Sequence, residues 1–109
     1  MQENNPLIGV SMNIILHAGD ARNNVNNALQ YARTFQFAKA EEEMKEAKEN
    51  IVLAHQSQTE VIQNEMSGFD YEPCLLFSHA QDTLMTINSE IQTADHLIEL
   101  YRLISESKK

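Results

Sequence analysis

The chain has 109 residues, and its apolar share of 42% is too high for a disordered polypeptide of this length. We therefore expect one folded domain, residues 1–109, with a single core. A formal net charge of −8 without a Lys/Arg cluster excludes nucleic acid as a natural partner. No apolar run approaches the ~20 residues of a membrane-spanning helix and no basic leader is visible, which predicts a cytoplasmic protein without direct membrane insertion.

The first predicted helix covers residues 6–33. Small and apolar side chains recur there every three or four residues, which is the period of one helix face. These positions are Leu7, Val10, Ile14, His17, Ala21, Val25, Ala28 and Ala32. Asn5 and Pro6 suit the start of this helix, because Asn can accept a hydrogen bond from an early backbone amide and Pro has no amide to leave unpaired.

Two further helices are predicted at residues 36–66 and 73–105 by the same spacing. The second apolar seam consists of Phe37, Ala40, Met44, Ala47, Ile51, Ala54, Gln58, Val61 and Glu65. The third consists of Phe77, Ala80, Leu84, Ile87, Ile91, Ala94, Ile98 and Tyr101. The connections are short, so consecutive helices should run antiparallel in an all-α three-helix bundle. Many seam residues are alanine, so each seam buries little apolar surface. Association of several bundles would compensate for these thin seams.

His79 and Asp82 are not explained by the third seam. At about 100° per residue they lie on the opposite side of the helix, three positions apart and therefore adjacent. Periodicity alone favours an exposed histidine and an ordinary surface carboxylate. A metal site built on the pair would need further ligands from other chains or elements.

Other residues have two readings each. Gly19 costs ~1 kcal/mol relative to alanine inside a helix, so it either permits the close approach of another group or is simply tolerated. Arg22 either supplies positive charge to a site or is solvated. Gln58 falls on the second seam, where it could fix register or contribute to a site. Cys74 has no cysteine to pair with; it is expected to fill a small apolar space rather than to be a reactive thiol, because no Lys or Arg flanks it.

Three motifs, taken in their order along the chain, resemble enzyme IIA of the lactose/cellobiose class of the phosphoenolpyruvate-dependent sugar phosphotransferase system. They are residues 19–22 (Gly-Asp-Ala-Arg) in the first helix, residues 55–59 (His-Gln-Ser-Gln-Thr) in the second, and residues 79–82 (His-Ala-Gln-Asp) followed by 84–86 (Leu-Met-Thr) in the third. The resemblance covers nearly the whole chain.

The resemblance implies a homotrimer, a nine-helix assembly of three bundles. It implies that His79 accepts a phosphoryl group from the phosphohistidine carrier protein and passes it to a cysteine of enzyme IIB. Asp82 would join its two symmetry copies around one divalent cation, Mg²⁺, at the trimer axis. Gln58, Gln81 and Thr83 are candidate donors to the phosphoryl group. Members of the family commonly carry histidine at the position of Thr83.

Two questions stay open at this point. The sugar could be lactose, cellobiose, chitobiose or a related β-linked oligosaccharide, because sugar selection belongs to the membrane component. The alternative function is a non-enzymatic trimeric helical module for interaction or regulation, which the thin alanine seams would equally permit.

Overall fold

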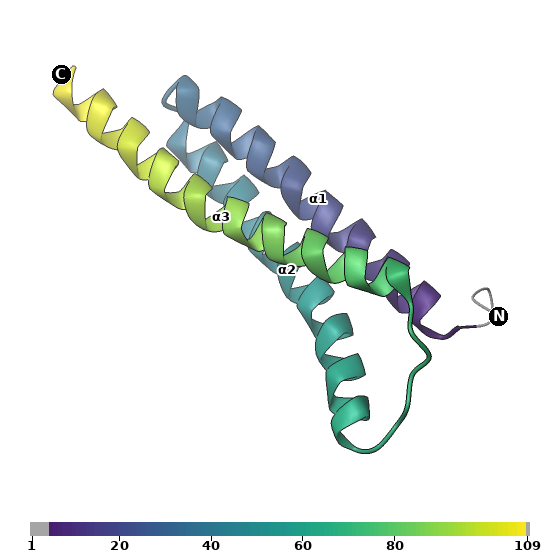
Figure 1. Cartoon of the computed structure of the whole chain (residues 1–109). Helices are drawn as coiled ribbons and strands as arrows, with labels where there is room; N and C mark the ends of the chain where they lie inside the picture. The colour runs from purple at the N-terminus through teal and green to yellow at the C-terminus, as the bar shows by residue number, and fades with distance from the viewer. Residues whose placement is uncertain (1–4, 109) are drawn as a thin grey trace.

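A computed structural model describes residues 5–108 of the chain. The described part contains three α-helices and no strand: α1 (Leu7–Arg33), α2 (Phe37–Met66) and α3 (Leu75–Ser107). Figure 1 shows them side by side in an elongated bundle, with the α1–α2 turn near the C-terminus and the start of α1 at the other end. The prediction of an all-helical chain with three helices is confirmed.

Asn5 begins α1 in the predicted way and also fastens it to the rest of the bundle. Its side-chain oxygen accepts a hydrogen bond from the Leu7 amide at 2.9 Å, which satisfies one of the unpaired donors of the first turn. Its side-chain nitrogen donates to the Glu72 carbonyl at 3.2 Å. The start of α1 is thereby held beside the segment that leads into α3.

Gly68 ends α2 in a left-handed conformation, with φ at +100°. Its amide donates to the Glu65 carbonyl and the Phe69 amide donates to the Asn64 carbonyl, each at 3.0 Å. This pair of bonds is the Schellman arrangement, in which glycine avoids the steric cost that a Cβ would carry. The predicted stop after α2 is therefore produced by backbone conformation.

Gly68→Ala is expected to lower the free energy of unfolding by about 1 kcal/mol, because an L side chain disfavours the left-handed region. An added Cβ would meet nothing within 4 Å, so backbone strain is the only cost. Urea unfolding monitored by circular dichroism would measure it. The matched control is Gly9→Ala, which also meets open space but lies inside helix α1 and should leave stability unchanged or raised. Equal losses in the two variants would contradict the prediction.

The core follows the third predicted seam closely and the first one less closely. Every predicted α3 position is buried except Tyr101, which is half-buried. On α1, Ser11 and Ala18 are buried where Val10 and His17 had been expected, and the latter two are half-buried. The reason is geometric. Because α1 packs against both α2 and α3, its most buried line of residues faces the space between these two helices. Buried Ser11 is satisfied by donating to the Leu7 carbonyl at 2.5 Å.

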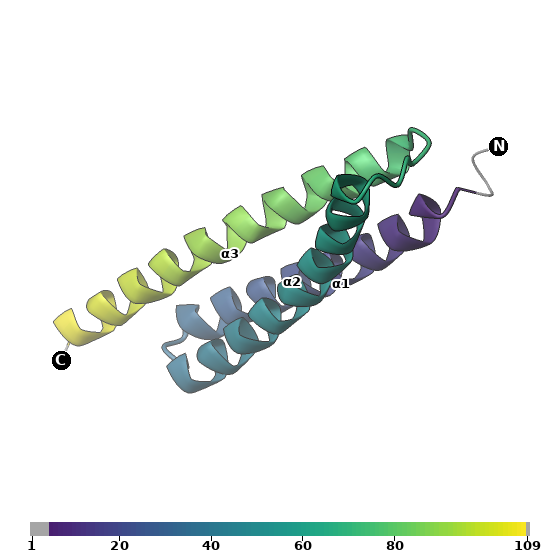
Figure 2. The same cartoon turned by 90° about the horizontal axis from the view of Figure 1, so that it is seen from below.

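The helices are not equally close to one another. Asn5 bonds to Glu72 and Arg22 bonds to Glu90, so α1 and α3 run parallel with a nearly constant separation of 67–68 residues. α2 runs antiparallel to both (Figure 2), and Figure 1 shows its C-terminal half diverging from α3. Glu65, expected on the second seam, is exposed there. The His79 end of the bundle is therefore more open between α2 and α3.

Candidate functional site

His79 and Asp82 lie in the first two turns of α3 and both are exposed. Cys74 precedes the helix in an extended conformation, so α3 begins just after Pro73 and Cys74 rather than at residue 73. Phe77, Ala80 and Leu84 of the same turns are buried. The helix thus presents His79 and Asp82 on the side away from its own core, where a partner can reach them.

The register between α1 and α3 places His79 beside the start of α1. With an offset of about 68 residues, His79 is level with Ser11 and Met12. Thr83 follows His79 by one turn on the same flank of α3 and is half-buried. We call this side of α3, next to α1, the His79 flank.

Gln81 and Gln58, the other two candidate donors, are placed elsewhere. Gln81 is about 200° from His79 around α3 and lines a groove on the opposite flank with Tyr71 and Glu72. Gln58 is half-buried on the core-facing stripe of α2. Of the three supporting residues, only Thr83 is brought next to His79 within one copy of the chain. Motif membership gave no information about which flank each residue occupies.

Arg22 does not supply charge to His79 in this arrangement. Its guanidinium makes a paired contact with the Glu90 carboxylate, at 2.9 Å and 2.8 Å. The hydrogen bond that Arg22 donates to the Glu90 carboxylate raises the pKa of Arg22 above its ordinary value, so the arginine is charged at any physiological pH. Glu90 is eleven residues beyond His79, or about 16 Å along the helix. Arg22 therefore joins α1 to α3.

The surroundings of His79 contain no Lys or Arg of their own. None occurs between Lys48 and Arg102, and none in residues 5–21. Acidic residues do occur at this end, including Glu65, Glu72 and Asp82. A negatively charged group bound at His79 would thus have to find positive charge in a partner or a bound cation.

Among residues 5–108, Asp82 has no ion-pair or side-chain hydrogen-bond partner. The three ion pairs of the described residues join Arg22 to Glu90, Lys48 to Asp95 and Glu41 to Arg102. Within residues 5–108 no three His, Cys, Asp or Glu side chains gather closely enough to hold a metal ion. One copy offers a single carboxylate at this position, and carboxylate oxygen is the ligand type that hard cations prefer.

The outer side of α3 carries a second seam, which the sequence pattern did not single out as a whole. Its members recur every three or four residues and are uncharged apart from Asp82. They are Leu75, His79, Asp82, Thr86, Ser89, Thr93, Leu97, Leu100 and Ile104. Leu75, Leu97, Leu100 and Ile104 are exposed although they are large and apolar. Such a stripe is typical of a helix that packs against further helices outside its own bundle.

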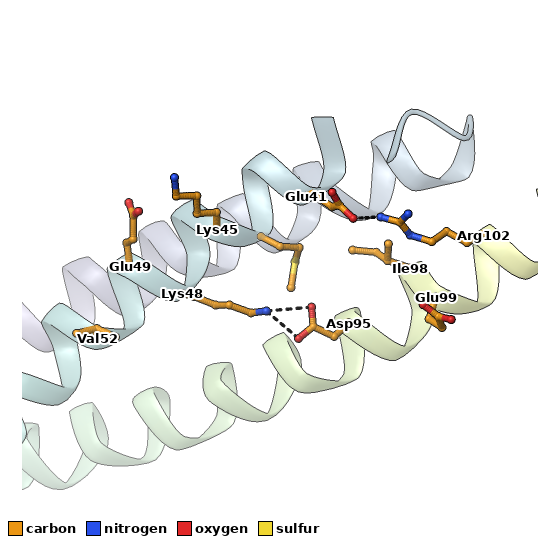
Figure 3. Close-up of a pocket in the computed structure, with 10 residues that line it drawn as sticks. Glu41, Lys45, Lys48, Glu49, Val52, Asp95, Ile98, Glu99 and Arg102 are labelled. Carbon is orange, nitrogen blue, oxygen red and sulfur yellow. Dashed lines mark hydrogen bonds and ion pairs between the residues drawn. The ribbon is translucent and has the colours of Figure 1, made fainter. Parts of the chain in front are cut away.

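A wide groove of the bundle lies away from His79. It has a volume of about 870 Å³ and runs between α2 and α3 around Asp95 and Ile98. Figure 3 shows Lys48 bonded to Asp95 and Glu41 to Arg102 across it. These charged pairs bridge the two helices across the groove, and we assign this groove no ligand.

Comparison with known proteins identifies this architecture. The family described as "PTS system, Lactose/Cellobiose specific IIA subunit" matches residues 9–102. The lichenan-specific phosphotransferase enzyme IIA component of Bacillus subtilis is 39% identical over 87% of this chain and 86% of its own. The lactose-specific EIIA component of Staphylococcus epidermidis is 40% identical over 82% and 86%. The crystal structure of the cellobiose-specific enzyme IIA of Bacillus anthracis superposes with a TM-score of 0.86, at 39% identity, covering 90% of each chain.

None of the three helices in the described residues is both long and apolar enough to span a bilayer.

Proposed function

Because the chain belongs to the lactose/cellobiose-specific IIA family and is thus a phosphotransferase component of a sugar uptake system, we propose that His79 is its phosphoryl-carrying residue. The observation that carries the proposal is the position of His79: exposed, on an outer face that its own bundle does not cover, and one turn from Asp82. An imidazole nitrogen is a competent nucleophile at neutral pH.

In the first step of the proposed reaction one P–N bond replaces another. A His79 ring nitrogen attacks the phosphorus of the phosphohistidine carrier protein in line, the donor P–N bond breaks, and the donor imidazole leaves. In the second step the thiolate of a cysteine of enzyme IIB attacks the same phosphorus and His79 leaves. Both steps depend on positioning and on stabilising the charged phosphoryl group. Since the His79 end lacks Lys and Arg, basic side chains of the two partners would supply that charge.

We further propose that three copies assemble around the outer seam of α3, a nine-helix homotrimer. The exposed Leu75, Leu97, Leu100 and Ile104 would be covered by this packing. Three Asp82 carboxylates would then meet at the axis and would repel one another without a cation. A divalent ion, Mg²⁺, fits three carboxylate oxygens. We also propose that the protein works in the cytoplasm, beside a membrane component that carries the sugar.

The sugar is proposed at the level of class. Relatives are named for lactose, lichenan and cellobiose, all β-linked saccharides. The alternative, a trimeric helical module without phosphoryl transfer, is motivated by the alanine-rich seams. One experiment separates the two: incubation with labelled phosphoenolpyruvate, enzyme I and the carrier protein. Stoichiometric, acid-labile label on the chain supports the carrier, and a trimer that takes up no label supports the alternative.

Thr83→Val is expected to slow phosphoryl acceptance by roughly threefold to tenfold, because it removes a hydroxyl next to His79 while keeping the side chain's shape. Thr83 is half-buried one turn from His79. Quenched-flow transfer from the phosphorylated carrier would measure the rate. Thr93→Val, on the same helix but ten residues further along, is the control and should leave the rate of phosphoryl acceptance unchanged. An unchanged rate in Thr83→Val would remove the residue from the phosphoryl site.

A further inference from the structure

The turn between α1 and α2 contains a residue in a backbone conformation that its side chain disfavours. Phe35 has a φ of +61°, in the left-handed region. Its amide donates to the Ala32 carbonyl at 3.0 Å, and the Gln36 amide donates to the Tyr31 carbonyl at 3.0 Å. This is the Schellman arrangement that also ends α2, where glycine occupies the left-handed position. A phenylalanine carries a steric cost there that glycine avoids, and retained strain of this kind points to a role for the side chain beyond the turn itself.

The Phe35 ring remains exposed at this strained turn. It retains 39% of its accessible surface although it stacks on Phe37, with 6.0 Å between the ring centroids. By the 68-residue offset between α1 and α3, Phe35 is level with Leu103, which is 54% exposed. Leu103 belongs neither to the core nor to the outer seam. Figures 1 and 2 show the turn beside the C-terminal end of α3, so two large apolar side chains are uncovered at this end of the bundle.

Basic side chains rest on the aromatic rings at the same end. We call residues 31–39 and 101–108 together the far tip. Each of three rings has one cation above it. The pairs are Lys108 on Phe35, Lys39 on Tyr31 and Arg102 on Phe37, at 6.0, 5.6 and 5.0 Å from the cation to the ring centre. These cation–π contacts hold positive charge next to apolar surface.

The far tip is locally basic on an acidic chain. It carries four basic residues, Arg33, Lys39, Arg102 and Lys108, and one acid, Glu106. Acidic residues resume at 41–43 on α2, where Glu41 is paired with Arg102, and at Glu99 on α3. Counted from Phe35 and Lys108, these acids begin about 9 and 14 Å inward along the helices. Charges are screened over about 8 Å at physiological salt, so a surface that touches the tip meets mainly the charges of the tip itself.

The opposite end of the bundle is acidic without a compensating base. Residues 5–21 and 53–89 contain no Lys or Arg. Their acids are Asp20, Glu60, Glu65, Asp70, Glu72 and Asp82. Asp82 lies 21 residues before Leu103, or about 31 Å along α3, which is roughly four screening lengths. A negatively charged surface would therefore attract the far tip, repel the other end, and orient the molecule tip first.

A flat surface matches three far tips better than a peptide does. In the proposed homotrimer the axis runs along the outer seam of α3, so the tips of three copies lie in one plane. One tip is too small to bind stably by itself, whereas three tips on one surface bind with the avidity of linked sites. A bilayer is flat on this scale, and it accepts basic side chains at anionic headgroups and aromatic rings at its interface. An acidic peptide would contact only one tip at a time.

We propose that the far tip docks the protein on a membrane surface that contains anionic phospholipid. The Phe35 ring enters the headgroup region, and Arg33, Lys39 and Lys108 meet the lipid phosphates. The joint action of three tips rests on the proposed homotrimer, and the composition of each tip does not. His79 lies 24 residues before Leu103, about 36 Å along α3, so it stays accessible to partner proteins while the tip is docked. Docking would hold the phosphoryl carrier beside the membrane component that carries the sugar.

Co-sedimentation with lipid vesicles tests the docking. The full chain should bind equimolar phosphatidylglycerol–phosphatidylcholine vesicles at low salt, release them at high salt, and not bind pure phosphatidylcholine vesicles. Phe35→Gly should bind the anionic vesicles about fivefold more weakly because an apolar ring is lost. Its melting temperature should not fall, because glycine relieves the left-handed strain. Phe69→Ala, which removes an exposed phenylalanine at the opposite end, is the matched control and should bind as the unmodified chain does.

A second pair of variants tests the charge of the tip. Lys39→Gln should weaken vesicle binding by about fivefold, whereas Lys45→Gln, six residues further along α2, should change it by less than about twofold. Equal binding to neutral and anionic vesicles, or unchanged binding by Phe35→Gly, would overturn the docking. Capture of the chain by immobilised polyglutamate without any binding to vesicles would also overturn it, and would identify an acidic protein as the partner of the tip.

Failure of the docking and failure of the proposed function give different results. Phe35→Gly should accept phosphate from the carrier protein in solution at the unmodified rate, because the tip lies far from His79. A chain that accepts phosphate but binds no anionic vesicles would overturn the docking alone. A chain that binds anionic vesicles but accepts no phosphate would support the docking and overturn the carrier. Vesicle binding by a chain that sediments as a monomer would support the tip and overturn the homotrimer.

Discussion

His79→Gln is expected to accept no phosphoryl group from the phosphorylated carrier protein. Glutamine retains polarity and hydrogen bonding, but its amide nitrogen is not a nucleophile, so the covalent intermediate cannot form. His79 is exposed, and exposed substitutions usually change stability by no more than about 0.5 kcal/mol. The helical circular dichroism and the oligomeric state should therefore be unchanged. Acid-labile, alkali-stable phosphate and intact mass would measure acceptance.

The control for this variant is His96→Gln. His96 is another exposed histidine of α3, seventeen residues beyond His79, or about 25 Å along the helix. It should accept phosphate at the rate of the unmodified chain. Equal phosphate on His79→Gln would show that the accepting residue lies elsewhere, and the remaining histidines, His17 and His55, would become the candidates.

The inner seams show what periodicity can predict. On α3, spacing alone placed the core, because the helix has one buried face, on which Leu84, Ile87, Ile91 and Ile98 are large aliphatic residues. On α1 the same reasoning preferred Val10 and His17, while the structure buries Ser11 and Ala18. A helix that contacts two neighbours places small residues where the backbones approach, and a hydropathy pattern does not register that requirement.

The site was predictable in part. About 100° per residue sufficed to place His79 and Asp82 outside the bundle, because a helix wheel needs no tertiary information. The ion pair between Arg22 and Glu90 was not predictable, since it depends on a 68-residue offset between parallel helices that are not consecutive in the chain. The flank occupied by Gln81 could have been read from its 200° separation from His79, but grouping by motif obscured it.

Asp82→Leu is expected to abolish binding of the proposed divalent cation and leave the proposed trimer assembled. Removing the carboxylates removes both the ligands and the mutual repulsion that the ion offsets. The remaining outer seam, including Leu97, Leu100 and Ile104, still offers apolar surface for packing. Metal content per chain, measured by elemental analysis of the isolated trimer, should fall to background.

Removing the cation with a chelator distinguishes an Asp82 that binds the metal from an Asp82 that only lies near it. EDTA should weaken the unmodified trimer, because three uncompensated Asp82 carboxylates would then face one another, and should have no effect on the Asp82→Leu trimer, which contains no such repulsion. Asp70→Leu, an exposed aspartate in the connection before α3, is the matched control and should keep both the metal and the sensitivity to EDTA. Analytical ultracentrifugation with and without chelator would show it. Stoichiometric metal retained in the Asp82→Leu trimer would refute the coordination role, because no second carboxylate of the described chain lies on the outer seam to replace it.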